Sequence, residues 1–193
     1  MTEDEILATF TRTGALLSGH FVLTSGLHSK HYFQCARVLQ HPELAEKFCS
    51  HLAQHFNKDN LDAVVAPAIG GILVAHEMAR ALGVRSLFTE REHGTMTLRR
   101  GFELKKGERI LVVEDVVTTG GSAKEVLSLV RELGGQTVAV ASLVDRSGGQ
   151  VDFGLPYHSL ISLQIQTYPP NDPELANLGP AVKPGSRSSG QNG

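Results

Sequence analysis

From residue 61 onward the sequence repeats one pattern: a short apolar run, a glycine-rich or polar loop, and a segment with helical spacing. The expected strands are residues 62–66, 84–88, 109–113 and 137–144. Strands that are apolar on both faces are typical of a parallel sheet covered by helices. A further run, residues 159–167, alternates apolar and polar residues as a half-exposed edge strand does. The sequence therefore predicts an α/β fold with an open, mostly parallel, five-stranded sheet flanked by helices.

The first 40 residues follow a different pattern. Thr2 and Glu5 have the spacing of a capping box, and apolar residues at helical spacing continue from there to Leu17. Two segments rich in aromatic and β-branched residues then flank a turn at residues 25–29. The strands expected from these segments are residues 21–24 and 31–38. We therefore predict a small N-terminal hood lobe over residues 1–40.

The rest of the chain divides into two further parts. Pro42 suits the first position of a helix, and the α/β core is expected over residues 41–168. The final 25 residues hold five of the eight prolines and four glycines. Such a composition favours a loosely packed or disordered tail over residues 169–193.

Composition excludes several classes of protein. Eighteen Lys and Arg against 20 Asp and Glu give no overall positive field, so nucleic acid is not an expected partner. The longest apolar run, residues 63–75, is shorter than the roughly 20 residues of a membrane helix, and Pro67 interrupts it. Acidic residues stand where a signal peptide would be basic, and two cysteines are too few for a disulfide framework. We expect a cytoplasmic protein without a membrane partner.

The most informative loop follows the strand at residues 109–113. It reads Glu114-Asp115-Val116-Val117-Thr118-Thr119-Gly120-Gly121-Ser122 and opens a helix. Glycines let the backbone approach a ligand closely, and the N–H groups at a helix N-terminus bind phosphate. The two carboxylates would repel a phosphate but accept hydrogen bonds from vicinal hydroxyls. Together these features indicate a site for a ribose 5-phosphate.

Other interpretations of these residues stay open at this point. Glu114 and Asp115 could simply favour the start of a helix, and the following glycines could form an ordinary turn. The loop is not a Walker A motif, because the Gly-Lys-Ser/Thr ending is missing. His51 and His55 have the spacing of paired metal ligands, but no third ligand is near in sequence, so we expect a solvated face and no protein metal site. Cys35 and Cys49 are expected to be buried small hydrophobes.

The string at residues 110–123 resembles the phosphoribosyl pyrophosphate (PRPP) signature of type I phosphoribosyltransferases. Four dipeptides narrow the resemblance to the orotate phosphoribosyltransferases: Ser25-Gly26, Tyr32-Phe33, Glu90-Arg91 and Asp145-Arg146. The resemblance extends over about residues 14–168. It implies a glycosyltransferase of pyrimidine biosynthesis in which orotate N1 displaces pyrophosphate from PRPP, with Mg²⁺, and orotidine 5′-monophosphate forms. It also implies a homodimer in which a mobile loop, residues 89–101, closes over the neighbouring subunit's site.

The resemblance also implies roles for individual residues. The PRPP-binding set is Arg91, Glu114, Asp115, Val116, Val117, Thr118, Thr119, Gly120, Gly121, Ser122, Ala68, Gly70 and Gly71. Within it the two acids would hold the ribose hydroxyls, residues 118–122 the 5-phosphate, and residues 68–71 would approach the pyrophosphate. The orotate-binding set is Thr118, Arg146, Tyr32 and Phe33, with the arginine fork on the orotate carboxylate. The catalytic set is Arg91, His93 and Asp115.

The sequence departs from the family pattern in its lysines. Family members commonly carry lysines in the mobile loop, in the pyrophosphate loop and before the Ser-Gly of the hood. Here residues 89–101 contain no lysine. Gly70 stands at the lysine position of the pyrophosphate loop, and Thr24 stands at the lysine position before Ser25-Gly26. Positive charge must then come from an arginine or histidine of the loop, the candidates being Arg91, Arg99, Arg100 and His93, although Arg99-Arg100 could equally be a solvated pair.

Two other functions are compatible with the same residues. The accepted base could be a purine or uracil, which would leave Arg146 without the carboxylate that it suits. The chain could also be a PRPP-sensing regulator that does not catalyse, acting on RNA, which the missing lysines favour and the net charge of −2 disfavours.

Overall fold

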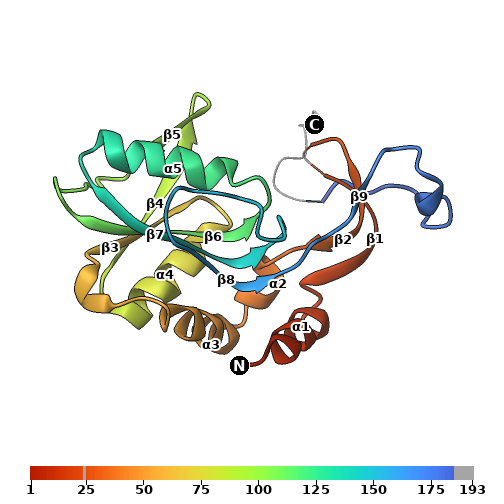
Figure 1. Ribbon diagram of the computed structural model, residues 1–193, viewed down its shortest axis with the longest axis horizontal. Helices are drawn as coiled ribbons and strands as arrows, with labels where there is room; N and C mark the ends of the chain where they lie inside the picture. The colour runs from red at the N-terminus through yellow and green to blue at the C-terminus, as the bar shows by residue number, and fades with distance from the viewer. Residues whose placement is uncertain (24, 185–193) are drawn as a thin grey trace. The chain divides into compact units, whose positions relative to one another are not determined.

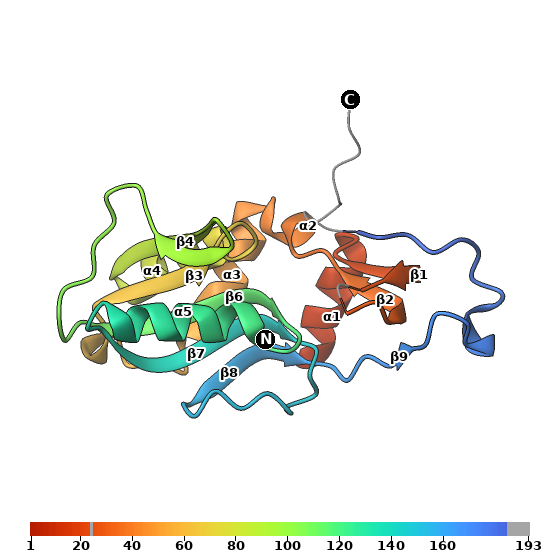
Figure 2. The same ribbon diagram turned by 90° about the horizontal axis from the view of Figure 1, so that it is seen from above.

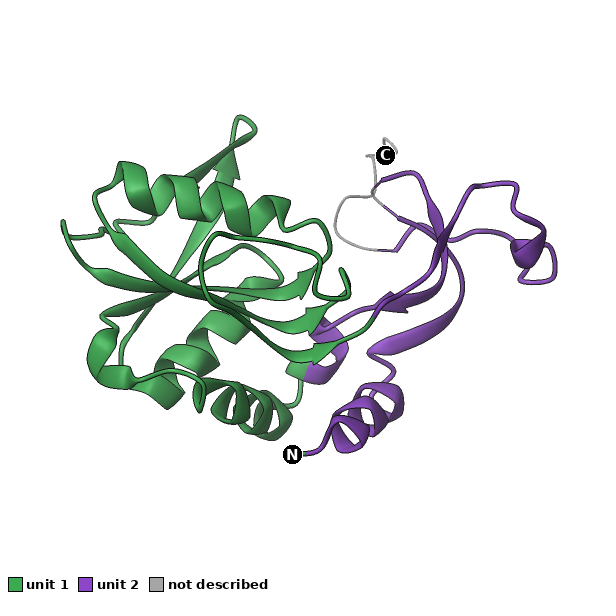
Figure 3. Cartoon of the chain, in the orientation of Figure 1, with its two compact units in different colours: residues 1, 39–163 green, residues 2–38, 164–193 purple. Residues whose placement is uncertain are grey.

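The computed structural model describes residues 1–23 and 25–184. Contacts group these residues into two compact units, coloured separately in Figure 3. Unit 1 contains residues 1 and 39–163, and unit 2 contains residues 2–38 and the described residues from 164 onward. Each unit has its own sheet.

Unit 1 is built on a six-stranded sheet in the order β5-β4-β3-β6-β7-β8. The strands are β3 (Ala63–Pro67), β4 (Arg85–Glu92), β5 (Thr95–Leu98), β6 (Arg109–Val117), β7 (Gln136–Asp145) and β8 (Tyr157–Ser162). Every neighbouring pair is parallel except β4 and β5. The predicted α/β class with a mostly parallel sheet is confirmed, with one strand more than the five expected.

Helices cover both faces of this sheet. They are α3 (Pro42–Ala53), α4 (Gly71–Leu82) and α5 (Gly121–Glu132). Figure 1 shows α5 on one face and α3 and α4 on the other. Burial on both faces explains why β3 is apolar throughout and why residues 110–113 of β6 are fully buried. Pro42 begins α3 as predicted, and Gly83 ends α4 in the left-handed conformation, with φ of 70°.

The charged segment at residues 89–100, which the resemblance assigns to a mobile loop, forms a hairpin. β4 continues to Glu92 and β5 returns antiparallel from Thr95. The two residues between them, His93 and Gly94, both have positive φ, as a tight hairpin turn requires. Met96 is buried, but the other side chains are largely polar. The hairpin therefore lacks the apolar alternation from which a strand is recognised in sequence.

Unit 2 contains α1 (Glu3–Arg12) and a sheet in the order β1-β2-β9, and the short helix α2 (Ala36–Leu39) spans the boundary between the units. The capping box is confirmed, because the backbone N–H of Glu5 donates to Thr2 Oγ1 and that of Thr2 donates to Glu5 Oε2. The helix ends earlier than predicted: Gly14 has φ of 66° and the Ala15 N–H returns to the carbonyl of Phe10. The residues after this cap start β1 (Leu16–Val22) instead of a further helical turn, and β2 (His28–Phe33) starts before the predicted residue 31.

The described C-terminal residues, up to residue 184, contact β1 and β2. The predicted strand at residues 159–167 is divided, because β8 ends at Ser162 and β9 (Thr167–Tyr168) pairs with β2. A short 3₁₀ helix, η2 (Pro173–Leu175), follows. The N–H of Val22 donates to the carbonyl of Val182 at 2.8 Å. Most of residues 169–184 are exposed, and their contacts with β1 and β2 are few. The expectation of a loosely packed tail stays a prediction, and residues 185–193 lie outside the described part.

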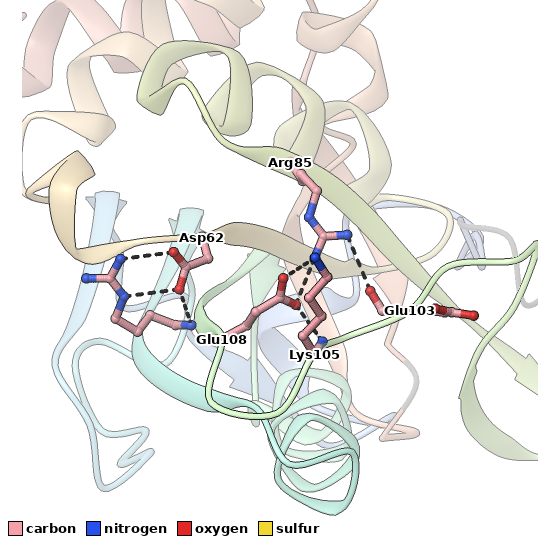
Figure 4. A network of polar contacts seen from close by, with 6 residues as sticks. Asp62, Arg85, Glu103, Lys105 and Glu108 are labelled. Atoms are coloured by element: carbon pink, nitrogen blue, oxygen red, sulfur yellow. Dashed lines mark hydrogen bonds and ion pairs between the residues drawn. The ribbon is translucent and has the colours of Figure 1, made fainter.

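Two ion pairs join the amino ends of the central strands of unit 1 (Figure 4). Asp62 accepts hydrogen bonds from the backbone N–H of Arg109 at 2.8 Å and from its Nε and Nη2 at 3.1 and 2.9 Å. Beside it, Arg85 donates to Glu108 at 2.7 Å. The hydrogen bonds from Arg109 lower the pKa of Asp62 from 3.8 to about 2.

This lowered pKa predicts a specific acid sensitivity. A carboxyl whose folded pKa is below its unfolded value contributes stability that is present above about pH 4 and is lost as the pH falls toward 2. We expect Asp62→Asn to unfold more easily than the wild type at neutral pH and to lose less stability between pH 4 and pH 2. Urea unfolding at several pH values measures this difference. Arg109→Ala should reproduce it, and an unchanged pH dependence in both variants would contradict it.

Candidate functional site

The loop between β6 and α5 has the geometry of a phosphate site. Thr118 and Thr119 are exposed in the turn, and no side chain caps the N-terminus of α5. The first backbone N–H groups of this helix therefore suit an anion. Gly120 has φ of +74°, and a Cβ at this position would lie 2.8 Å from Cγ1 of Val151. Glycine is thus required both by the backbone conformation and by the close packing. Figure 2 shows that α5, which follows this loop in the chain, runs along the sheet.

Two carboxylates stand at the carboxyl end of β6, directly before the loop. Glu114 is buried and Asp115 is half-buried. The loop after β3 meets them: a Cβ at Gly70 would lie 2.6 Å from Oδ2 of Asp115, and one at Gly71 would lie 3.6 Å from Oε1 of Glu114. The structure therefore brings together the residues predicted to bind the ribose hydroxyls and those predicted to approach the pyrophosphate.

Thr89 supports the loop after β3 and was not singled out from the sequence. It is fully buried in the middle of β4 and lies opposite Pro67 in the parallel register. Its carbonyl accepts the N–H of Ala68 at 2.7 Å, and its hydroxyl donates to the carbonyl of Ala66 at 3.3 Å. The sequence signal that could have identified Thr89 is its position, a polar residue directly after the apolar strand predicted at residues 84–88.

Arg146 directly follows β7, next to the phosphate loop. Its backbone N–H donates to the carbonyl of Val117 at 2.8 Å, one residue before Thr118. The same loop approaches again at Val151 and Phe153, which both lie within 3 Å of a Cβ placed on Gly120. Loops from β3, β6 and β7 therefore meet at one edge of the sheet, as expected where parallel strands end.

The three arginines of the predicted mobile loop lie in the β4–β5 hairpin or directly after it, and all are ion-paired. His93 lies in the turn of the hairpin. Arg91 donates from Nη2 to Oε1 of Glu125 at 2.8 Å, and its Nη1 is 2.6 Å from Oε2. The hydrogen bond with Glu125 raises the pKa of Arg91. Glu125 lies one turn after the start of α5. It was not predicted as a site residue, because no local pattern in the sequence identifies Arg91 as its partner. Arg99 pairs with Glu92 and Arg100 with Glu90 across the hairpin.

Two further predicted residues belong to unit 2. Phe33 is buried and packs edge-to-face on Phe10, with ring centroids 5.4 Å apart. The ring centroids of Tyr32 and Phe21 are 5.8 Å apart. Their contact with a base stays a prediction, and Thr24, which replaces a family lysine, lies outside the described residues.

The weaker sequence candidates have structural explanations. His55 stacks on His158 with ring centroids 4.7 Å apart, and burial lowers the pKa of His158. Cys35 and Cys49 are buried, as predicted, and burial raises the pKa of Cys49 to about 12. In residues 1–23 and 25–184 no group of three or more His, Cys, Asp or Glu side chains is arranged to hold a metal ion. Within the same residues, no helix is long and apolar enough to cross a membrane.

Comparison with known proteins identifies the family. The phosphoribosyl transferase domain model matches residues 35–164. The orotate phosphoribosyltransferase of Desulforamulus reducens is 56% identical and that of Pelotomaculum thermopropionicum 57% identical, each aligned with 97% of this chain and with 98% and 99% of its own length. The crystal structure of orotate phosphoribosyltransferase from Aeropyrum pernix is 28% identical, with a TM-score of 0.68 over 82% of this chain and 93% of that one. The resemblance found in the sequence is confirmed: the chain belongs to the orotate phosphoribosyltransferase family.

Proposed function

We propose that the protein transfers the 5-phosphoribosyl group of PRPP to N1 of orotate, forming orotidine 5′-monophosphate and pyrophosphate in pyrimidine biosynthesis. The observation that carries this proposal is the meeting of three loops at the carboxyl ends of β3, β6 and β7. Each loop suits one part of the reactants. The loop at residues 118–122 would bind the 5-phosphate, residues 68–71 the pyrophosphate, and Arg146 the carboxylate of orotate.

The reaction divides charge between two parts of the site. As the C1–O bond of PRPP breaks, positive charge develops on the ribose ring and negative charge on the leaving pyrophosphate. Glu114 and Asp115, at the end of β6, would hold the ribose hydroxyls and stabilise the positive ring. Cations of the β4–β5 hairpin, Arg91 first, would stabilise the pyrophosphate. The protein therefore positions and stabilises, and it supplies no nucleophile of its own.

Mg²⁺ is part of the proposal. The carboxylates of Glu114 and Asp115 offer oxygen atoms, the ligand type that this ion prefers. We expect the ion to be held mainly by oxygens of PRPP and by water, with these carboxylates nearby. When bound, it would neutralise charge on the leaving pyrophosphate.

We further propose a cytoplasmic homodimer in which the β4–β5 hairpin reaches the neighbouring subunit's site. The pair between Arg91 and Glu125 lies within one chain, so such a movement would first have to break it. Two apolar side chains are well exposed here, Ile69 in the loop at residues 68–71 at 75% and Leu73 in the first turn of α4 at 48%. A second copy of the chain is one partner that would cover them.

The function is tested by pyrophosphate release from PRPP and Mg²⁺ with orotate, uracil, hypoxanthine or adenine. We expect release with orotate alone, because Arg146 suits a carboxylated base. Arg146→Ala should raise the KM for orotate selectively, leaving that for PRPP nearly unchanged. Pyrophosphate release only with another base would exclude orotate as the substrate. PRPP binding without pyrophosphate release with any base would favour a PRPP-sensing regulator that does not catalyse.

Arg91→Ala should lower kcat by about 10²-fold, the usual effect of removing one preorganised electrostatic contact. Steady-state kinetics with saturating PRPP and orotate measure this effect. Arg131→Ala, at the opposite end of α5, is the matched control and should keep the wild-type kcat. An unchanged kcat in Arg91→Ala would remove this arginine from the catalytic set.

Gly70→Ala should weaken PRPP binding, because the added Cβ would stand 2.6 Å from the carboxylate of Asp115 and displace it. We expect the KM for PRPP to rise about tenfold, the equivalent of one lost hydrogen bond to a charged group. The melting temperature should change little, since residue 70 is exposed. Normal PRPP binding in this variant would show that Asp115 does not need its present position.

A further inference from the structure

The carboxylate of Asp145 organises the turn that carries Arg146. The side chain is 1% exposed at the end of β7. Its Oδ1 accepts the backbone N–H of Ser147 at 2.8 Å and the hydroxyl of Ser147 at 2.7 Å. Its Oδ2 accepts the N–H of Gly149 at 2.9 Å and the hydroxyl of Ser162, in β8, at 3.0 Å. One buried carboxylate thus fixes the residues that follow Arg146 and joins them to the neighbouring strand.

Ser147 extends this network along the loop. While its hydroxyl donates to Asp145, the same oxygen lies 3.1 Å from the N–H of Gln150 and 3.2 Å from that of Val151. On the other side, the N–H of Arg146 is held by the carbonyl of Val117. The backbone of Arg146 is therefore held between β6 and a turn that depends on Asp145.

We propose that Asp145, together with Ser147, is a positioning residue for recognition of the base by Arg146, an inference that rests on the function proposed above. A guanidinium binds a carboxylate through two parallel hydrogen bonds, which requires a well-placed side chain. The carboxylate of Asp145 is already occupied by four donors from the turn and β8. Its role is to hold the turn in place, and the arginine would contact the substrate.

The phosphate loop contacts this network through Val151, but it also has a support outside the network. Gly120 packs against Val151 and Phe153. Phe153 is held separately by Tyr157, with ring centroids 5.0 Å apart, and by the core of unit 1. Changes at Asp145 should therefore affect residues 146–149 more than the PRPP site.

Asparagine cannot replace Asp145 in this network. Each carboxylate oxygen accepts at least one backbone N–H, that of Ser147 on Oδ1 and that of Gly149 on Oδ2. Whichever oxygen became the amide NH₂, a donor would face a donor. Asp145→Asn thus keeps the size of the side chain and breaks half of the network.

The first test compares KM values in Asp145→Asn and Ser147→Ala. We expect the KM for orotate to rise about tenfold, a loss of about 1.4 kcal/mol in binding, and the KM for PRPP to stay within about twofold. Ser147→Thr, which keeps the hydroxyl, should restore the wild-type value. Ser142→Ala is the matched control, because it removes a buried hydroxyl of β7 that bonds Tyr157 instead of the turn. If Asp145→Asn does not fold, Ser147→Ala decides alone.

The second test is equilibrium binding of orotidine 5′-monophosphate and of uridine 5′-monophosphate, which lacks the carboxylate. The wild type should prefer the first, and Asp145→Asn should lose much of that preference, as Arg146→Ala should. Equal weakening of both nucleotides, or an unchanged KM for orotate, would overturn the positioning role and leave the proposed function standing. A wild type that does not use orotate would overturn the proposed function itself.

Discussion

Burial of the central strands on both faces is the constraint on which the rest of unit 1 depends. β3 and residues 110–113 of β6 are covered by helices on each side, so polar groups fit only where these strands end. Because the strands are parallel, their carboxyl ends meet at one edge. The two acids of β6, the glycine loop after β3 and Arg146 after β7 lie there for this reason. The amino ends hold a different chemistry, the ion pairs of Asp62 and Arg85, which join strands.

Close backbone approach, more than positive charge, characterises the described part of the site in unit 1. Gly70 and Gly120 stand where any side chain would collide with Asp115 or with Val151 and Phe153. A phosphate bound at the N-terminus of α5 would be held mainly by N–H groups and hydroxyls. This arrangement fits a sequence that lacks the lysines common in its family. The nearby hairpin arginines are ion-paired with glutamates, so their charge becomes available to a substrate only when those pairs open.

Several elements could not be predicted, and the reasons are physical. The β4–β5 hairpin depends on a two-residue turn with positive φ and on ion pairs between its strands. Neither feature produces the repeating pattern of apolar residues by which a strand is recognised in a sequence. The end of α1 was missed because the left-handed conformation of Gly14 outweighed the helical spacing that continues to Leu17. Residues 169–184 have the composition of a tail, yet Leu175 is buried and Lys30 pairs with Glu174 at 2.6 Å. Composition does not report such distant contacts.

The α/β class, the glycine-rich loop predicted to bind phosphate and the two acids before it could be predicted from the sequence, because apolar runs and glycine-rich turns act through local conformation and burial. Arg146 could likewise be predicted as a site residue, through a motif whose residues are adjacent in the chain. Three features became visible only in the folded chain: the loops that meet, the pair of Glu125 with Arg91, and the bonds from Asp145 to the turn around Arg146. These contacts join residues from different strands and helices, and a single sequence does not encode such pairs in any local pattern.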